Sequence, residues 1–145
     1  MARYLKSLPP QRLSGAYVAG RAAFGPADGR YDGRSNTLGE AAFKGFCMAC
    51  HGADGKGQVP GIPSLAGNPS VLSEDASSLI RIVVEGGRGP MVAGMPAPVV
   101  MPGFAGTLTD AQLARTLTYL RQSWGNDARE VTTSDVAKMR SKINR

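Results

Sequence analysis

One stretch, Cys47-Met48-Ala49-Cys50-His51, decides the fold of this 145-residue chain, which contains two cysteines and one histidine in all. Two thiols three residues apart on one helical turn can add to the two vinyl groups of a single porphyrin. The next residue then lies beside the ring, where its imidazole reaches the iron. The stretch therefore predicts one covalently attached haem c, anchored through Cys47 and Cys50, with His51 as an axial ligand.

Other chemistries of a Cys-X-X-Cys pair fit the sequence less well. A thioredoxin-like redox pair expects a βαβ pattern nearby, and none is visible. A structural zinc site needs four protein ligands, and the chain has no further Cys or His to act as the fourth. A disulfide across four residues would constrain little of the unfolded chain. Zinc and a redox disulfide are therefore kept as minor alternatives.

The composition fits one small domain built around a cofactor. Hydrophobic residues make up 42% and aromatic residues 6%, with Gly 19 and Pro 10, which favours a loop-rich fold centred on the macrocycle. The net charge of +6 favours a generic basic surface, suits an acidic protein partner, and comes with no nucleic-acid motif. No stretch approaches the roughly twenty apolar residues of a transmembrane helix.

Two helices are predicted in the first half of the chain. Thr37 and Glu40 fit a capping box, so we expect a helix that leads into the Cys47–His51 stretch. Apolar residues at helical spacing predict a second helix over Ser73–Glu85, capped by its first residue and ended by Gly86. Its expected apolar face consists of Ala76, Leu79, Ile80, Val83 and Val84.

Two further helices are predicted after an irregular, proline-rich segment over residues 86–106. Thr109 and Gln112 form a second capping box at the start of a strong helix. Its expected buried stripe consists of Leu113, Leu117, Leu120 and Trp124. A short amphipathic tail helix is predicted from Val136, Met139 and Ile143.

The chain divides into three segments by composition. We expect an N-terminal extension or linker over residues 1–36, with the end of a helix at Arg3–Leu8. A haem domain is expected over residues 37–126 and a C-terminal tail over residues 127–145. The opening residues lack the apolar core of a signal peptide, although haem c attachment normally follows export. We therefore expect a periplasmic protein whose export signal was removed or lies upstream.

The second axial position of the iron decides between electron transfer and small-molecule chemistry. The chain has no second histidine, so methionine is the next candidate. Two of the six methionines are terminal and one lies between the cysteines, which leaves Met91, Met95 and Met101. Met101 is favoured because Pro102 stiffens the loop beside it and the last helix follows. Met95, Met91 and an open iron site stay as alternatives.

Further segments carry a family resemblance. Gly39 and Phe43 precede Cys47 on the first helix, and Tyr119 lies on the last strong helix. The chain also contains Pro63-Ser64-Leu65-Ala66-Gly67 and Met101-Pro102-Gly103-Phe104. Over about residues 37 to 126 this pattern resembles class I c-type cytochromes. The resemblance implies an all-α fold, in which a few helices and long Gly/Pro-rich loops wrap one covalently bound haem.

The resemblance also implies roles for individual residues. Tyr119 would pack across the first helix at Phe43. The carbonyl of Pro63 would accept the Nδ1–H of His51, and Leu65 would pack on the ring. Met101 would be the second axial ligand.

A narrower similarity rests on several longer stretches. They are Ala53–Gly57, Leu65–Pro69, Ser78–Val83, Leu117–Arg121, Ser123–Asn126 and Asp135–Lys138. Together they are similar to the C-terminal haem domain of the multi-haem cytochrome subunits of bacterial membrane dehydrogenases of the alcohol, gluconate and sorbitol type. Met1–Pro10 looks like the last helix of a preceding haem domain. Two further haem motifs are absent, which leaves open a fragment, a diverged single-haem protein or a misplaced start.

The resemblance implies single-electron transfer rather than an enzyme. A periplasmic dehydrogenase subunit would donate the electrons, and quinone or another cytochrome or oxidase would accept them. Membrane association would come only through these partners. The alternatives are a free soluble shuttle with one haem, which would not co-purify with a dehydrogenase, and a haem sensor or enzyme with an open iron site, which would bind carbon monoxide fast and tightly.

Overall fold

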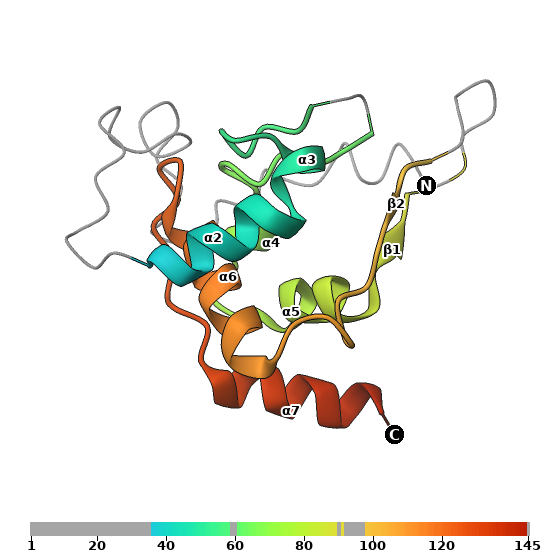
Figure 1. The fold of residues 1–145 in the computed structure, drawn as a ribbon, viewed down its shortest axis with the longest axis vertical. Helices are drawn as coiled ribbons and strands as arrows, with labels where there is room; N and C mark the ends of the chain where they lie inside the picture. The colour runs from blue at the N-terminus through green and yellow to red at the C-terminus, as the bar shows by residue number, and fades with distance from the viewer. Residues whose placement is uncertain (1–35, 59–60, 90, 92–97, 145) are drawn as a thin grey trace, which may run out of the picture.

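The computed structural model describes residues 36–58, 61–89, 91 and 98–144, and its described part is mostly helical, as the sequence predicts (Figure 1). The helices are α2 Thr37–Phe46, α3 Met48–His51, α4 Pro69–Leu72, α5 Ser77–Glu85, α6 Asp110–Gln122 and α7 Thr133–Ile143. Two short strands, β1 Gly87–Arg88 and β2 Val100–Met101, pair antiparallel. The expected end of a helix at Arg3–Leu8 lies outside the described residues. Among the described helices, none is long and apolar enough to cross a membrane.

Helices α2 and α6 cross in close contact at Gly39 (Figure 1). A Cβ added at Gly39 would collide with the carbonyl oxygen of Arg115 on α6, so only glycine lets the two backbones approach this closely. One turn later the side chain of Phe43 is 1% exposed, with its ring centroid 5.5 Å from that of Tyr119. The expected packing of Tyr119 across the first helix is confirmed.

Helix α2 begins where the sequence predicts, but its cap is different. The N-cap is Asn36, whose side chain accepts the N–H of Gly39 at 2.9 Å. Glu40 forms an ion pair with Lys44 at 2.7 Å instead of closing a capping box. The predicted box was wrong because Asn36 is one of the strongest capping residues and stands one position earlier.

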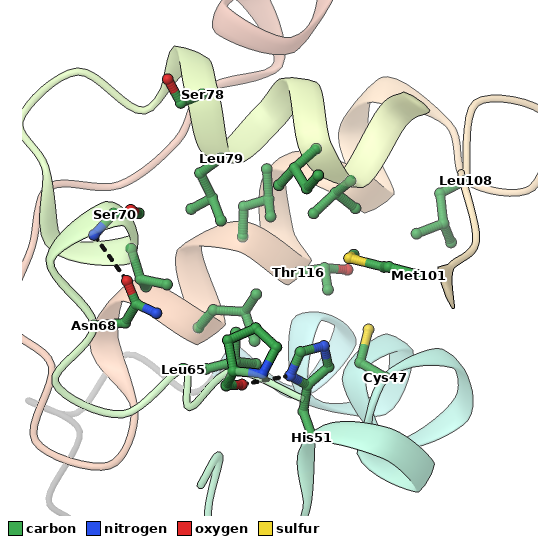
Figure 2. A pocket seen from close by; sticks show the side chains of 16 residues that line it. Cys47, His51, Leu65, Asn68, Ser70, Ser78, Leu79, Met101, Leu108 and Thr116 are labelled. Carbon is green, nitrogen blue, oxygen red and sulfur yellow. Dashed lines mark hydrogen bonds between the residues drawn. The ribbon is translucent and has the colours of Figure 1, made fainter. Parts of the chain in front are cut away.

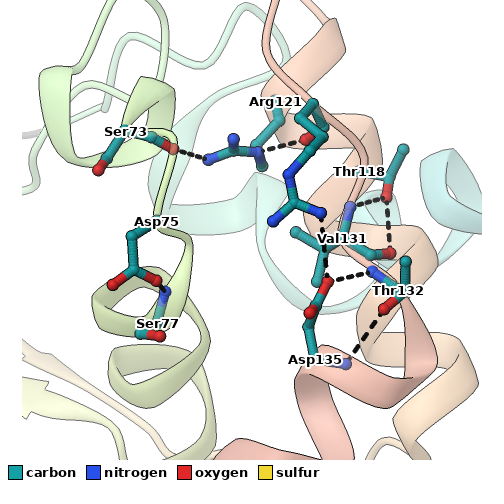
Figure 3. Close-up of polar contacts among 9 residues, drawn as sticks. Ser73, Asp75, Ser77, Thr118, Arg121, Val131, Thr132 and Asp135 are labelled. Atoms are coloured by element: carbon teal, nitrogen blue, oxygen red, sulfur yellow. Dashed lines mark hydrogen bonds and ion pairs between the residues drawn. The ribbon is translucent and has the colours of Figure 1, made fainter.

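Helix α5 begins at Ser77, four residues later than predicted. The predicted capping residue, Ser73, instead ends the separate short helix α4. The side chain of Asp75 accepts the N–H of Ser77 at 2.9 Å, which turns the chain into α5 (Figure 3). The apolar face was predicted correctly, since its five residues are all buried, and Gly86 ends the helix with φ +80°.

A buried arginine ties α4 to α6 (Figure 3). Arg121 is 1% exposed, and its Nη1 donates to the carbonyl oxygens of Val71 at 2.6 Å and Ser73 at 2.8 Å. Its Nε donates to the carbonyl oxygen of Arg129 at 2.7 Å. Burial lowers the pKa of Arg121, although a guanidinium stays charged at neutral pH. These bonds offset the cost of burying the charge and hold three segments together.

The last two helices lie where the sequence predicts them. The predicted capping box of Thr109 with Gln112 is present at α6, and its predicted leucines are buried, namely Leu113, Leu117 and Leu120. The predicted tail helix is confirmed as α7, with Val136 and Met139 buried. A further capping box, of Thr132 with Asp135, begins α7 (Figure 3).

The expected buried stripe of α6 was wrong at Trp124, because the helix ends at Gln122 before reaching this residue. Its backbone adopts φ +53°, a left-handed conformation that is rare for a bulky residue. This turn directs the indole back over Phe43, at a centroid distance of 5.1 Å. The indole N–H also donates to the carbonyl oxygen of Ala53 at 2.8 Å, so Trp124 fixes the loop that follows His51.

The irregular segment contains the unpredicted pair β1–β2, in which Gly87 lies opposite Met101. Just beyond it, Gly103 is pressed against the end of α5. A Cβ added at Gly103 would lie 2.7 Å from the carbonyl carbon of Glu85 and 2.8 Å from the carbonyl oxygen of Val84. The Met101 segment is therefore held by backbone contact against α5.

Replacing Phe43 with alanine is expected to lower the free energy of unfolding by about 3–5 kcal/mol, because it empties the contact between α2 and α6. Urea unfolding followed by far-UV circular dichroism measures the change. The control is Leu38→Ala on the same helix, where the side chain is 60% exposed. We expect that control to stay within about 0.5 kcal/mol of the parent; equal losses in both variants would contradict the packing.

The Gly103→Ala substitution is expected to lower the free energy of unfolding by about 1–3 kcal/mol, because the added methyl group meets rigid backbone atoms. Thermal unfolding measures it against Gly106→Ala, since a Cβ at Gly106 meets nothing within 4 Å. That control should leave the free energy of unfolding unchanged or raise it by up to about 1 kcal/mol, because alanine reduces the conformational entropy of the unfolded chain. Identical melting temperatures for the two variants would disprove the close approach.

Candidate functional site

Two adjoining cavities, of about 390 Å³ and 420 Å³, open beside the Cys47–His51 stretch. One is lined mainly from α4, α5 and α6, and the other from β1, β2 and residues 61–63. The residues common to both are Cys47, His51, Pro63, Ile82 and Met101. Protein interiors rarely leave voids larger than a water molecule, so this crevice has the size and shape of a ligand site.

His51 ends the one-turn helix α3 and is 8% exposed. Its Nδ1 lies 3.2 Å from the carbonyl oxygen of Pro63 (Figure 2). Because a carbonyl only accepts, Nδ1 carries the proton and Nε2 keeps its lone pair. Burial lowers the pKa of His51, although the bond to Pro63 partly opposes this effect. The neutral imidazole is the form that ligates a metal.

The two cysteines lie on one turn at the edge of the crevice. Cys47 is half-buried and lines both cavities, whereas Cys50 is exposed and lines the second cavity. Burial, with a smaller effect from Cys50, raises the pKa of Cys47 to about 11. Its sulfur is therefore a neutral thiol at pH 7, which suits the apolar wall beside it.

The three candidate methionines differ in position. Met101 is partly buried and lines both cavities. Met91 is 77% exposed and lines neither, and Met95 lies outside the described residues. Figure 2 shows the thioether of Met101 and the imidazole of His51 reaching into the crevice from different elements, with the sulfur of Cys47 beside them.

The lining fits a large, flat, apolar group. Four large apolar side chains of the second cavity are exposed to solvent: Phe46 (47%), Ile82 (41%), Val99 (41%) and Val100 (53%). A macrocycle in the crevice would remove this surface from water, which is favourable. Among the described residues there is no group of three or more His, Cys, Asp or Glu that could hold a bare metal ion. The zinc alternative therefore lacks a ligand set in this part of the chain.

The crevice also has features that the motifs did not indicate. Leu65 was expected at the ring and lines the first cavity, as do the unpredicted Asn68, Ser70 and Ser78. These three form a polar end, which Figure 2 shows on the side away from Cys47. Single serines and asparagines carry no spacing signal, so only the arrangement of α4 and α5 identifies them.

Several known proteins similar to this chain are cytochrome c subunits of dehydrogenases. The chain is 37% identical over 144 residues to the alcohol dehydrogenase (quinone) cytochrome c subunit of Gluconacetobacter polyoxogenes, covering 97% of this chain and 30% of that protein. It is 36% identical over 146 residues to the protein of the same description from Gluconobacter oxydans, covering 97% and 29%. It is 38% identical over 146 residues to the gluconate 2-dehydrogenase cytochrome c subunit of Pantoea cypripedii, covering 97% and 32%.

The chain thus spans about 30% of the length of the first of these relatives. The sequence pattern of the cytochrome c family matches residues 36–124, which include α2 to α6 and the whole crevice described above. With Cys47 and Cys50 spaced for two thioether bonds, this match implies one covalently bound haem c with its iron. The chain therefore belongs to the cytochrome c family and transfers electrons through a c-type haem.

Proposed function

We propose that this domain carries single electrons from a periplasmic dehydrogenase toward the respiratory chain, with the haem iron held between His51 and Met101. The observation that supports this ligand pair is that both side chains line both parts of the crevice. A haem placed across the crevice would have one of them on each face. When bound, haem c supplies one-electron exchange between ferric and ferrous iron.

The surrounding residues fix the geometry of this site. Cys47 and Cys50 tether the cofactor, and the carbonyl of Pro63 orients the imidazole through Nδ1 at 3.2 Å. Leu65, 8% exposed, lines the first cavity and would pack on the ring and exclude water from the histidine side. A thioether from Met101 raises the reduction potential relative to a second imidazole. With His51 and Met101 holding the iron in both oxidation states, electron transfer would require little rearrangement.

The polar end of the crevice suits the haem carboxylates. Asn68, Ser70 and Ser78 lie on the side away from Cys47, and the carboxylates of a haem lie opposite its vinyl-derived edge. The side chain of Asn68 is already engaged, accepting from the N–H of Ser70 at 2.9 Å and donating to the carbonyl oxygen of Ser64 at 2.7 Å. The second N–H of the Asn68 amide and the two serine hydroxyls are the donors at this end for a carboxylate.

The proposed donor rests on the relatives, whose names describe cytochrome c subunits of alcohol and gluconate dehydrogenases. In this scheme the oxidation of the organic substrate belongs to the partner subunit, and the haem domain only carries electrons. Quinone, another cytochrome or an oxidase accepts them. The net charge of +6 favours partners with an acidic docking face.

Met101→Ala is expected to abolish the weak red-region absorption of the ferric protein, which is typical of a bond from a thioether to iron. It should also lower the reduction potential by on the order of 100 mV, since axial ligands set haem potentials over about 0.8 V. Optical spectroscopy and redox titration measure both effects. The control is Met91→Ala, at a 77% exposed methionine, which should match the parent.

Two results would contradict this assignment. Loss of the red-region band in Met95→Ala, with the band kept in Met101→Ala, would move the ligand to the other methionine. Fast, tight binding of carbon monoxide to the reduced parent protein would indicate an open iron site and favour the sensor or enzyme alternative.

Mixing the oxidised holoprotein with a membrane dehydrogenase of the alcohol or gluconate type should reduce the haem only when the substrate of that dehydrogenase is present. Stopped-flow absorption measures the rate. The rate should fall several-fold as salt rises from about 10 to 150 mM, because screening weakens the attraction between a basic domain and an acidic face. A holoprotein that elutes alone and is reduced by no such dehydrogenase would instead be a free shuttle.

A further inference from the structure

Helix α7 lies outside the part of the chain that matches the cytochrome c family. The match ends at residue 124, whereas α7 spans Thr133–Ile143. Yet α7 is packed on α5 and α6, with Val136 0% and Met139 8% exposed (Figure 1). Because α7 is packed in this way, a change in α7 can affect the neighbouring parts of the haem domain.

Arg140, in the last turn of α7, makes three contacts with one neighbouring segment. Its Nη1 donates to the carbonyl oxygen of Ala105 and its Nη2 to that of Leu108, each at 2.6 Å. Its Nε lies 2.6 Å from Oδ1 of Asp110, as an ion pair without the alignment of a hydrogen bond. A planar guanidinium holds its donors in a rigid fork on three separate nitrogens, whereas an ammonium group carries its three donors on one nitrogen at the end of a flexible stem.

Ala105 and Leu108 lie in the segment that connects β2 to α6, and this segment, residues 102–109, is called the axial loop below. The end of α5 also binds the axial loop. The N–H of Phe104 donates to the carbonyl oxygen of Val83 at 2.9 Å, and the N–H of Ala105 donates to that of Val84 at 3.2 Å. The loop is therefore held by both α5 and Arg140, three to seven residues after Met101.

The axial loop has little apolar burial to hold it closed. Its residues Ala105, Gly106 and Thr107 are exposed, as are Pro102 and Gly103. The buried anchors are Phe104 and Leu108, each at most 8% exposed, and Leu108 lines the same cavity as Met101. Segments with few buried contacts open locally before the whole protein unfolds. Arg140 fixes the carbonyl of Leu108 and so opposes this opening.

We propose that α7 braces the axial loop, with Arg140 as a positioning residue that keeps the sulfur of Met101 at the haem iron. This inference rests on the proposed function, in which Met101 is an axial ligand. Breaking the brace frees the loop without disturbing the helices that carry the cysteines and His51. Arg140 then affects how often the iron loses its sulfur ligand, and much less how stable the whole domain is.

The competing explanation is that Arg140 only attaches α7 to the domain. The two explanations differ in which measurement changes. If Arg140 only attaches α7, replacing it lowers the stability of the whole fold and leaves the opening of the axial loop relative to global unfolding unchanged. A brace changes the loop opening separately from global unfolding.

The test compares the parent holoprotein with Arg140→Gln, using two probes in one urea titration. The red-region band of the ferric form reports the sulfur–iron bond, and far-UV circular dichroism reports the helices. In Arg140→Gln we expect the band to disappear at a clearly lower urea concentration than the helical signal. The gap between these two urea concentrations should be wider than in the parent. Carbon monoxide should also bind the reduced variant about tenfold faster or more, because two charge-assisted bonds no longer hold the loop.

The control is Lys142→Gln, which removes the same charge from an exposed position in the same last turn of α7. It should behave as the parent in both probes. Arg140→Lys keeps the charge but loses the planar fork, so it should resemble Arg140→Gln. If Arg140→Gln gives no holoprotein, Asp110→Asn, which removes the carboxylate contact together with the acidic charge in the first turn of α6, should show the same changes at smaller size.

The outcomes separate the two proposals. A parent protein with no red-region band overturns the Met101 assignment and the brace with it. A parent with the band, and with Arg140→Gln or Asp110→Asn showing the parental gap and parental carbon monoxide rate, overturns the brace alone. If the helical signal and the band are both lost at lower urea concentrations in Arg140→Gln, with the parental difference between them, Arg140 only attaches α7. That result also overturns the brace.

Discussion

The close approach of α2 and α6 at Gly39 is the constraint on which the site depends. A side chain at Gly39 would collide with the carbonyl oxygen of Arg115, so the crossing requires glycine. Once the backbones meet there, Phe43 and then Cys47 follow at four-residue spacing on the same face of the chain. The crossing therefore sets where the haem attachment stretch begins relative to α6, and thus where the crevice opens.

The cofactor is a structural part of this domain as well as its redox centre. The crevice of two cavities, about 390 Å³ and 420 Å³, lies among side chains that would otherwise form the hydrophobic core. Ile82 and Phe46 are 41% and 47% exposed beside it, so much of their apolar surface is left uncovered by the protein. Burial of these side chains by the macrocycle supplies stabilisation that a chain with few aromatic residues cannot obtain from its own packing.

Sequence predicted well where a signal is local, and poorly where a structure depends on distant segments. The haem stretch, the box at Thr109 and the apolar face of α5 are patterns within a few residues of one another. The predicted start of α5 was wrong because Asp75, rather than Ser73, forms the turn that leads into the helix. The contacts of Arg121 with Val71 and of Trp124 with Ala53 join segments 50 and 71 residues apart, which no spacing rule can predict.

The same distinction separates the two sides of the crevice. On the histidine side, the imidazole is oriented locally, since His51 binds Pro63 twelve residues away, while Trp124 fixes the loop after His51 from 71 residues away. On the methionine side, support comes from α5 and from α7, 32 to 35 residues from the loop carbonyls that Arg140 binds. The orientation of the imidazole is thus set within a short stretch of the chain, whereas the position of the segment after Met101 depends on contacts from α5 and α7.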